Sequence, residues 1–145
     1  MCDVPQDGPA SIFIVDDDEA VRDSVRVLLE ARGFEAFAYE SAATVLAALE
    51  RRRPTCLVLD LHMPGVDGLE LLKTLRARDI RLPTVMITGR IDQVSRRAAR
   101  DAGAATVLAK PFADDELFDA IRAARRDAAA GAGADIRSIP NCHPR

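Results

Sequence analysis

The chain has 145 residues, with 20 lysines and arginines against 23 aspartates and glutamates and a formal net charge of −3. Its 48% hydrophobic and 30% charged residues are typical of a globular protein and exclude a disordered one. This length predicts one domain whose core needs no disulfide or metal in order to fold. The mildly acidic balance argues against a general nucleic-acid binder, which would carry a strongly basic face.

Five short apolar runs, each followed by a segment of helical periodicity, make up the body of the chain. All but the second run are almost continuously apolar, as expected of strands that are covered on both faces of a parallel sheet. The runs are Ile12–Asp16, Phe34–Ala38, Cys56–Asp60, Thr84–Thr88 and Thr106–Lys110. Of the five expected helices, the first ends before Gly33, the second begins after Ser41 and the third begins near Asp67. The fourth spans about Asp92–Gly103 and the fifth about Asp114–Arg126.

This alternation predicts an α/β fold with five successive βα units. The simplest arrangement is a flavodoxin-like, doubly wound, five-stranded parallel sheet with the strand order 2-1-3-4-5. Residues 11–126 are expected to form this domain. Residues 1–10 are expected to be a flexible arm, and the Ala/Gly-rich residues 127–145 a linker or a disordered tail.

The number and spacing of the cysteines, and the absence of any apolar segment long enough to span a membrane, predict a cytoplasmic protein without a membrane anchor. Cys2, Cys56 and Cys142 are odd in number and far apart, so they fit neither a disulfide framework nor a zinc site. The first ten residues lack the basic and apolar regions of a secretory signal. No apolar stretch approaches the roughly 18 residues that a membrane-spanning helix needs.

Polar and ionisable residues stand where four of the predicted strands end. They are Asp16 and Asp17 after the first strand, Asp60 after the third, Thr88 after the fourth and Lys110 after the fifth. Ligands of open α/β sheets bind outside the carboxyl ends of the strands. Because the first and third strands are neighbours in the order 2-1-3-4-5, the three carboxylates are expected to converge, with the hydroxyl and the ammonium group on the far side.

This constellation predicts phosphoryl chemistry. Three carboxylates so close together imply a hard cation, and Mg²⁺ prefers oxygen ligands and a phosphate partner. Asp60 can then act as a nucleophile and form an aspartyl-phosphate, while Lys110 neutralises phosphoryl oxygens and Thr88 donates a hydrogen bond to one of them. Asp18 is expected only to cap the first helix. Of the 20 basic residues only Lys73 and Lys110 are lysines, and a compact ammonium suits a phosphate.

Four motifs stand in this order along the chain: VDDDEAVRDSV, LDLHMPGVDGLELL, MITG and AKPF. Together they resemble the receiver domain of two-component response regulators over residues 11–126. The wording of LDLHMPGVDG and ITG is most similar to the group that includes the nitrogen-fixation regulators.

The resemblance implies a phosphorylation switch rather than an enzyme acting on an external substrate. Asp60 would accept a phosphoryl group from the phosphohistidine of a histidine kinase or a phosphotransfer protein. Asp16 and Asp17, with the backbone carbonyl of His62, would hold Mg²⁺ beside Asp60, and the Lys110–Pro111 bond would be cis. The fourth helix, fifth strand and fifth helix would form the face that binds a downstream protein or a second copy.

One position departs from the family. Val107 stands three residues before Lys110, where the family often has a tyrosine or phenylalanine that couples to the threonine. An aromatic relay cannot operate through a valine, so we expect switching through backbone shifts of the fourth strand's loop and the fourth helix. Phosphorylation itself does not depend on this position.

Several alternatives stay open at this point. An aspartate-nucleophile phosphohydrolase would share the chemistry, but it would usually carry an acid where His62 stands and would need a substrate cap. With 19 residues after Arg126 there is no room for a DNA-binding output domain, so the chain is expected to be a stand-alone receiver or the receiver fragment of a transcriptional regulator. The basic cluster of Arg96, Arg97 and Arg100 fits equally well a solvated face and a partner-binding face.

Overall fold

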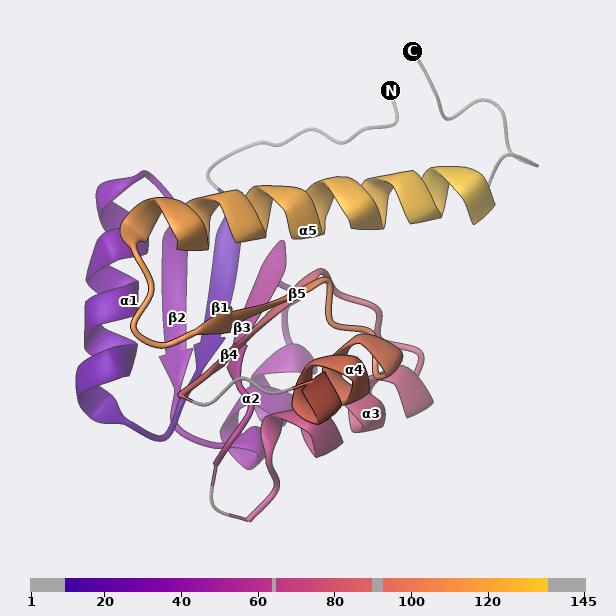
Figure 1. The fold of residues 1–145 in the computed structure, drawn as a ribbon, viewed down its shortest axis with the longest axis horizontal. Helices are drawn as coiled ribbons and strands as arrows, with labels where there is room; N and C mark the ends of the chain where they lie inside the picture. Colours follow the sequence, from indigo (N-terminus) through magenta and orange to yellow (C-terminus); the bar gives the residue numbers. More distant parts are fainter. Residues whose placement is uncertain (1–9, 64, 90–92, 136–145) are drawn as a thin grey trace.

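The computed structural model describes residues 10–63, 65–89 and 93–135, with side chains as far as residue 126. It contains a five-stranded parallel sheet in the order β2-β1-β3-β4-β5, with a helix after every strand (Figure 1). The predicted fold class and strand order are therefore confirmed. Residues 1–9 of the predicted arm and residues 136–145 of the predicted tail lie outside the described residues.

The strands begin and end close to the predicted positions. They are β1 (Ser11–Val15), β2 (Glu35–Tyr39), β3 (Cys56–Asp60), β4 (Thr84–Thr88) and β5 (Thr106–Ala109). Every residue of β3 and β4 is buried, because these inner strands are covered on both faces. The register aligns Leu59 of β3 with Val15 of β1, and Asp60 with Ile87 of β4, so the strand ends meet at one edge.

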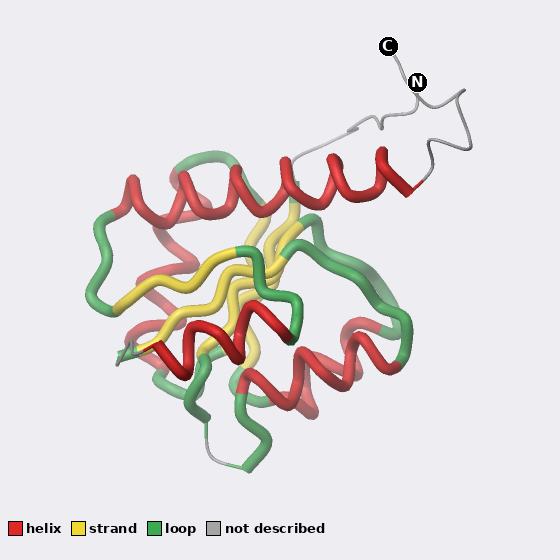
Figure 2. Tube along the Cα trace, turned by 45° about the vertical axis from the view of Figure 1, so that its right-hand side comes forward, coloured by secondary structure: helices red, strands yellow, loops and turns green. Residues whose placement is uncertain are grey.

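Two apolar layers hold helices against opposite faces of the sheet, and Figure 2 shows helices on both sides of the strands. On one face, α1 (Glu19–Ala31) and α5 (Asp114–Asp135) pack through Val25, Leu29, Leu117 and Ile121. On the other face lie α2 (Ala42–Leu49), α3 (Gly68–Ala77) and α4 (Gln93–Asp101). Among these three helices α4 contributes the least to the core, since Ala99 is its one buried residue.

Three helices begin where their capping residues predict. The side chain of Asp18 accepts hydrogen bonds from the backbone N–H groups of the first turn of α1, and Ser41 and Asp67 do the same for α2 and α3. Gly33 follows α1 with a φ of 91°, a left-handed conformation that glycine adopts without strain. Asp18 is thus a helix cap, as predicted.

Helix α5 runs nine residues further than the sequence predicted. The expected end was Arg126, whereas the helix continues to Asp135 and in Figure 1 extends well past the sheet. Alanine has the highest helix propensity, so the run Ala128–Ala130 favours continuation of the helix, although each glycine that follows costs about 1 kcal/mol relative to alanine. The first part of the predicted linker is therefore helical. No described helix is long and apolar enough to cross a membrane.

Candidate functional site: an acidic cluster at the strand ends

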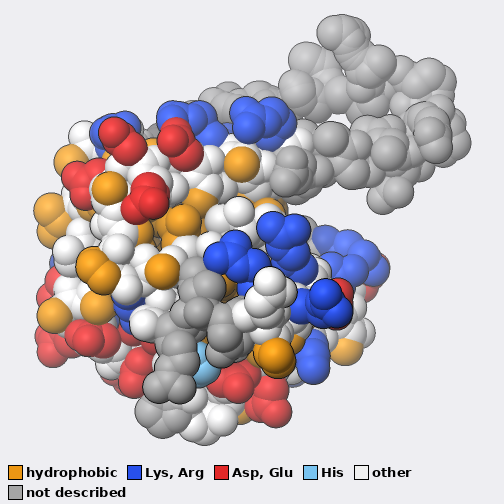
Figure 3. Space-filling view, in the orientation of Figure 1, with side chains coloured by type: hydrophobic (Ala, Val, Ile, Leu, Met, Phe, Trp, Pro, Cys, Tyr) orange, Lys and Arg blue, Asp and Glu red, His pale blue; other side chains and the backbone are white. Residues whose placement is uncertain are grey.

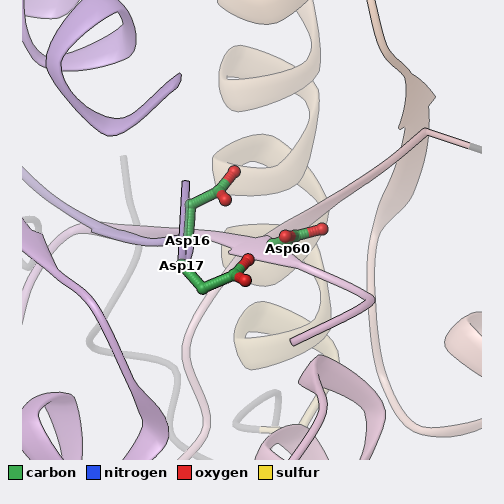
Figure 4. A group of neighbouring side chains, drawn as sticks. All are labelled: Asp16, Asp17 and Asp60. Atoms are coloured by element: carbon green, nitrogen blue, oxygen red, sulfur yellow. The ribbon is translucent and has the colours of Figure 1, made fainter. Parts of the chain in front are cut away.

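The site forms where β1 and β3 end side by side. Asp16 and Asp17 follow the last residue of β1, and Asp60 is the last residue of β3. One carboxylate oxygen from each of the three lies within 4.8 Å of the others, and Figure 4 shows the side chains gathered together. Asp16 is 0% and Asp60 3% exposed, whereas Asp17 faces solvent. The predicted convergence of the three carboxylates is present in the structure.

Lys110 is the cation of this cluster. Its Nζ lies 3.1 Å from Asp16 Oδ2 and 3.6 Å from Asp60 Oδ2. The Lys110–Pro111 bond is cis, as the family resemblance implied. The Lys110 N–H donates to the Thr88 carbonyl at 2.7 Å, which holds the lysine at the end of β4. Burial lowers the pKa of Lys110, but the hydrogen bonds with and charges of the two aspartates outweigh burial and raise it. The ammonium group therefore stays charged.

The pKa of the Asp60 carboxyl group is raised toward neutral pH. Burial and the neighbouring charge of Asp16 raise its pKa to about 7, although the charge of Lys110 and the His62 N–H, which donates to Asp60 Oδ1 at 3.3 Å, lower it. A buried carboxylate beside a second carboxylate is destabilised in its ionised form unless positive charge lies nearby. This environment is unusual for a structural aspartate and typical of a reactive one.

The oxygen atoms of the cluster suit a hard divalent cation. Asp16 Oδ2 is buried and, apart from the ion pair with Lys110, accepts no hydrogen bond from any residue that the structure describes. The three ligand atoms that lie together are carboxylate oxygens, which Mg²⁺ prefers. The residues present therefore fit the predicted Mg²⁺.

An open groove of about 560 Å³ leads to the cluster. It is lined by Asp17, Asp18, Asp60, His62, Gly89 and Lys110. The side chain of His62 is exposed at this rim, so any metal ligation by His62 would come from its backbone carbonyl. Thr88 is fully buried at the end of β4, one position beyond the residue that aligns with Asp60. The groove admits a small phosphorylated group to Asp60.

Arg22 is a supporting residue that the sequence analysis missed. Its guanidinium donates to the backbone carbonyl of Asp16 at 2.8 Å, while Asp16 Oδ1 accepts the N–H of Asp18 at 2.9 Å. Together these bonds fix the loop that carries the acidic residues. The available signal was the position of Arg22 in the first turn of α1, directly after that loop, but many surface arginines share such a position.

Replacing Arg22 with alanine is expected to lower the free energy of unfolding by about 1–2 kcal/mol, because a charged donor to a half-buried backbone carbonyl is lost. The matched control is Arg26→Ala on the same helix. Arg26 forms only exposed ion pairs with Asp23 and Glu30, and its loss should cost less than about 0.5 kcal/mol. Urea unfolding of both variants measures the difference. Equal stabilities would show that Arg22 does not support the loop.

Comparisons with known proteins agree with this geometry. The family model of the response regulator receiver domain matches residues 12–122. Transcriptional regulatory protein FixJ of Bradyrhizobium diazoefficiens is 40% identical over 117 residues, which cover 81% of this chain and 57% of that protein. Response regulator MprA of Mycobacterium sp. (strain KMS) is 41% identical over 132 residues, which cover 90% of this chain and 57% of that protein. The chain thus spans little more than half the length of these relatives.

Solved structures of similar proteins share the fold. The crystal structure of FixJ-N has a TM-score of 0.76 and 38% identity, covering 84% of this chain and 96% of that one. Full-length FixJ from B. japonicum has a TM-score of 0.80 and 38% identity, covering 92% of this chain and 66% of that one. With the strand order, the acidic cluster and the match over residues 12–122, these findings show that the chain belongs to the response-regulator receiver-domain family of two-component signalling switches.

Proposed function

We propose that this domain accepts a phosphoryl group on Asp60 from the phosphohistidine of a histidine kinase or a phosphotransfer protein. The observation that carries the proposal is the placement of Asp60: it is buried at the end of β3, within 4.8 Å of two further carboxylates and 3.6 Å from the Lys110 ammonium group. Burying a carboxylate beside two others destabilises a fold unless a cation is bound there, so such a cluster is typical of a functional site. The open groove gives a donor access to Asp60.

The residues around Asp60 have separate roles in this proposal. Asp16 and Asp17, with the backbone carbonyl of His62, would hold Mg²⁺, which when bound supplies positive charge for the phosphoryl oxygens. An Asp60 carboxylate oxygen attacks phosphorus, and the phosphorus–nitrogen bond of phosphohistidine breaks. Lys110 favours the ionised, nucleophilic form of Asp60 and then pairs with a phosphoryl oxygen. The Thr88 hydroxyl donates a hydrogen bond to another phosphoryl oxygen.

The proposed output face consists of α4, β5 and α5. Val107 is 9% exposed and packs in the core cluster that contains Ala99, Ala102 and Ala104. With no aromatic ring at this position, the signal would travel through shifts of the β4–α4 backbone. The weak anchoring of α4 by Ala99 suits such a shift. A downstream protein or a second copy of the domain would read the change.

The basic residues of α4 lie on this proposed face. Arg96, Arg97 and Arg100 are exposed, and Figure 3 shows basic side chains gathered over α4. Exposure fits both expectations stated for them, a solvated face and a partner-binding face. The partner-binding alternative predicts that replacing them changes output without changing phosphorylation of Asp60.

A second proposal concerns the whole protein: this domain would be the receiver portion of a cytoplasmic transcriptional regulator. The printed name of the relative FixJ, a transcriptional regulatory protein, supports it, and the chain covers 57% of that protein's length. A phosphohydrolase activity has less support, because His62 stands two residues after Asp60 where such enzymes usually carry an acid.

Labelling with a small phosphodonor tests the proposed function. The wild type is incubated with radiolabelled acetyl phosphate and Mg²⁺. The phosphorylated fraction is then measured after separation at acidic pH, at which an aspartyl-phosphate persists. Asp60→Asn should abolish labelling, whereas Asp18→Asn should keep it, since asparagine also caps a helix and the proposal gives the Asp18 side chain no part in the reaction. Equal labelling of the wild type and Asp60→Asn would contradict the assignment of Asp60.

A further inference from the structure

Helix α2 and Tyr39 of the edge strand β2 line a groove that contains none of the side chains proposed to act in phosphorylation. Among the described strands β2 pairs only with β1, so its outer side is free. The groove has a volume of about 620 Å³ and is lined by Tyr39, Thr44, Ala47, Ala48, Arg51 and Arg52. Positions 44, 47 and 48 form one face of α2, because residues three and four apart are neighbours on a helix, and Arg51 and Arg52 follow the end of that helix. The groove therefore lies over this helix face and the end of β2.

The backbone of β2 has outward-facing hydrogen-bonding groups beside this groove. The Glu35 N–H donates to the Ala10 carbonyl at 2.9 Å, and the Tyr39 carbonyl accepts the Asp16 N–H at 3.2 Å. Because backbone groups of a strand alternate in direction, residues 35, 37 and 39 face β1 and the N–H and C=O groups of Ala36 and Ala38 face outward. The strand, EAFAY, has neither the lysine nor the proline that commonly blocks an exposed edge.

Two arginines give the groove a positive charge. The Arg52 guanidinium lies 4.4 Å from the centre of the Phe37 ring. Burial raises the pKa of Tyr39, and the charges of Arg52 and Arg51 oppose this rise, so both guanidinium groups lie close to the phenol. Neither arginine forms an ion pair with a carboxylate of the described residues. Two cations thus stand unpaired beside the apolar floor made by the alanines of α2.

We propose that this groove binds an extended acidic peptide segment of a partner protein as an added strand on β2. The peptide backbone pairs with Ala36 and Ala38, which supplies affinity without sequence preference. Alternate side chains of a strand share one face, so one groove-facing carboxylate meets Arg51 and Arg52 while an apolar side chain two residues away packs on Tyr39. This site is separate from Asp60 and does not depend on phosphorylation.

An extended peptide fits the observations better than a compact ligand, because the outward-facing backbone groups of β2 recur over several residues up to Tyr39, where the groove begins. The test uses a fluorescein-labelled octapeptide of alternating threonine and valine in which one valine is replaced by glutamate. A second peptide carries glutamine at that position. Fluorescence anisotropy measures affinity, and nitrogen-15 amide shifts locate the bound peptide.

The glutamate peptide is expected to shift the amide signals of Ala36 and Ala38 and to bind about five-fold more tightly than the glutamine peptide. Arg51→Ala and Arg52→Ala should each remove most of that preference. Arg78→Ala, which removes an exposed arginine that follows α3, is the matched control and should leave it unchanged. Absence of amide shifts at millimolar peptide would overturn the proposal, as would equal affinity for the two peptides or an equal effect of Arg78→Ala.

Ala38→Pro tests the added strand directly. It removes an outward-facing N–H without removing a bond to β1, and edge strands tolerate such a proline. Binding of the glutamate peptide should be lost while the melting temperature stays close to that of the wild type. Unchanged binding would overturn the proposal. A dimer that the wild type forms without peptide and that Ala38→Pro abolishes would also overturn it, because a second copy of the chain would then occupy β2. If the variant does not fold, the amide shifts and arginine variants decide.

Discussion

Replacing Asp60 with asparagine is expected to stabilise the metal-free protein by about 1–3 kcal/mol above pH 7. Asp60 has a pKa of about 7 in the folded state, against an ordinary value of 3.8. The folded state therefore binds more protons than the unfolded state between these two values. The free energy of unfolding of the wild type falls as the pH rises from about 4 to 7, and it levels off above. Asparagine has no charge to bury, so this loss disappears.

The size of the effect follows from two opposing contributions. Each unit between the two pKa values corresponds to about 1.4 kcal/mol, and the pKa of about 7 already includes the attraction between Asp60 and Lys110. The amide of asparagine still buries a polar group, which reduces the gain. Urea unfolding of both proteins at pH 5, 6, 7 and 8 without divalent cations measures the difference. It should grow between pH 5 and 7 and then stay constant. A difference that is zero or negative at pH 8 would show that the apo cluster tolerates the ionised Asp60.

Replacing Gly68 with alanine is expected to destabilise the protein by about 3 kcal/mol. A Cβ at this position would overlap the backbone carbonyl of Asp60 and press on Leu61, and these are backbone atoms that cannot turn aside. Gly68 begins α3, and its N–H donates to the Leu61 carbonyl at 2.9 Å. The close approach of α3 to the end of β3 therefore sets the position of Asp60, so we expect phosphorylation to slow as well.

Gly89→Ala is the matched control for Gly68→Ala. Gly89 lines the same groove, but a Cβ there meets no atom within 4 Å. Its replacement should leave stability unchanged or raise it by about 0.5 kcal/mol, since alanine restricts the unfolded chain. Thermal and urea unfolding compare the two variants. Unchanged stability of Gly68→Ala would mean that the contact between α3 and Asp60 yields without cost, and similar losses in both variants would mean that the loss does not come from this contact.

The sequence was sufficient to predict the sheet because each strand is short, apolar and bounded by turn residues. It also placed Asp16, Asp17, Asp60 and Lys110 together, since parallel strands bring their carboxyl ends to one edge. The end of α5 was wrong because the Ala/Gly composition suggested a linker while alanine propensity continued the helix to Asp135.

Other features depend on contacts that no local pattern encodes. The bond from Arg22 to the Asp16 carbonyl joins a helix to the preceding loop through a long side chain with many rotamers. The approach of Gly68 to Asp60 and the groove of Tyr39, Arg51 and Arg52 arise only when α3 and α2 pack on the sheet. Such features are set by tertiary packing, so a sequence read element by element does not reveal them.

The central claim is that Asp60 carries the phosphoryl group. Mass spectrometry after borohydride reduction of the phosphorylated protein locates an acyl phosphate, because reduction converts the modified aspartate to homoserine. We expect conversion at Asp60 alone, dependent on Mg²⁺ and on the phosphodonor. Conversion at Asp16 or Asp17, or a phosphorylated protein with an unconverted Asp60, would contradict it.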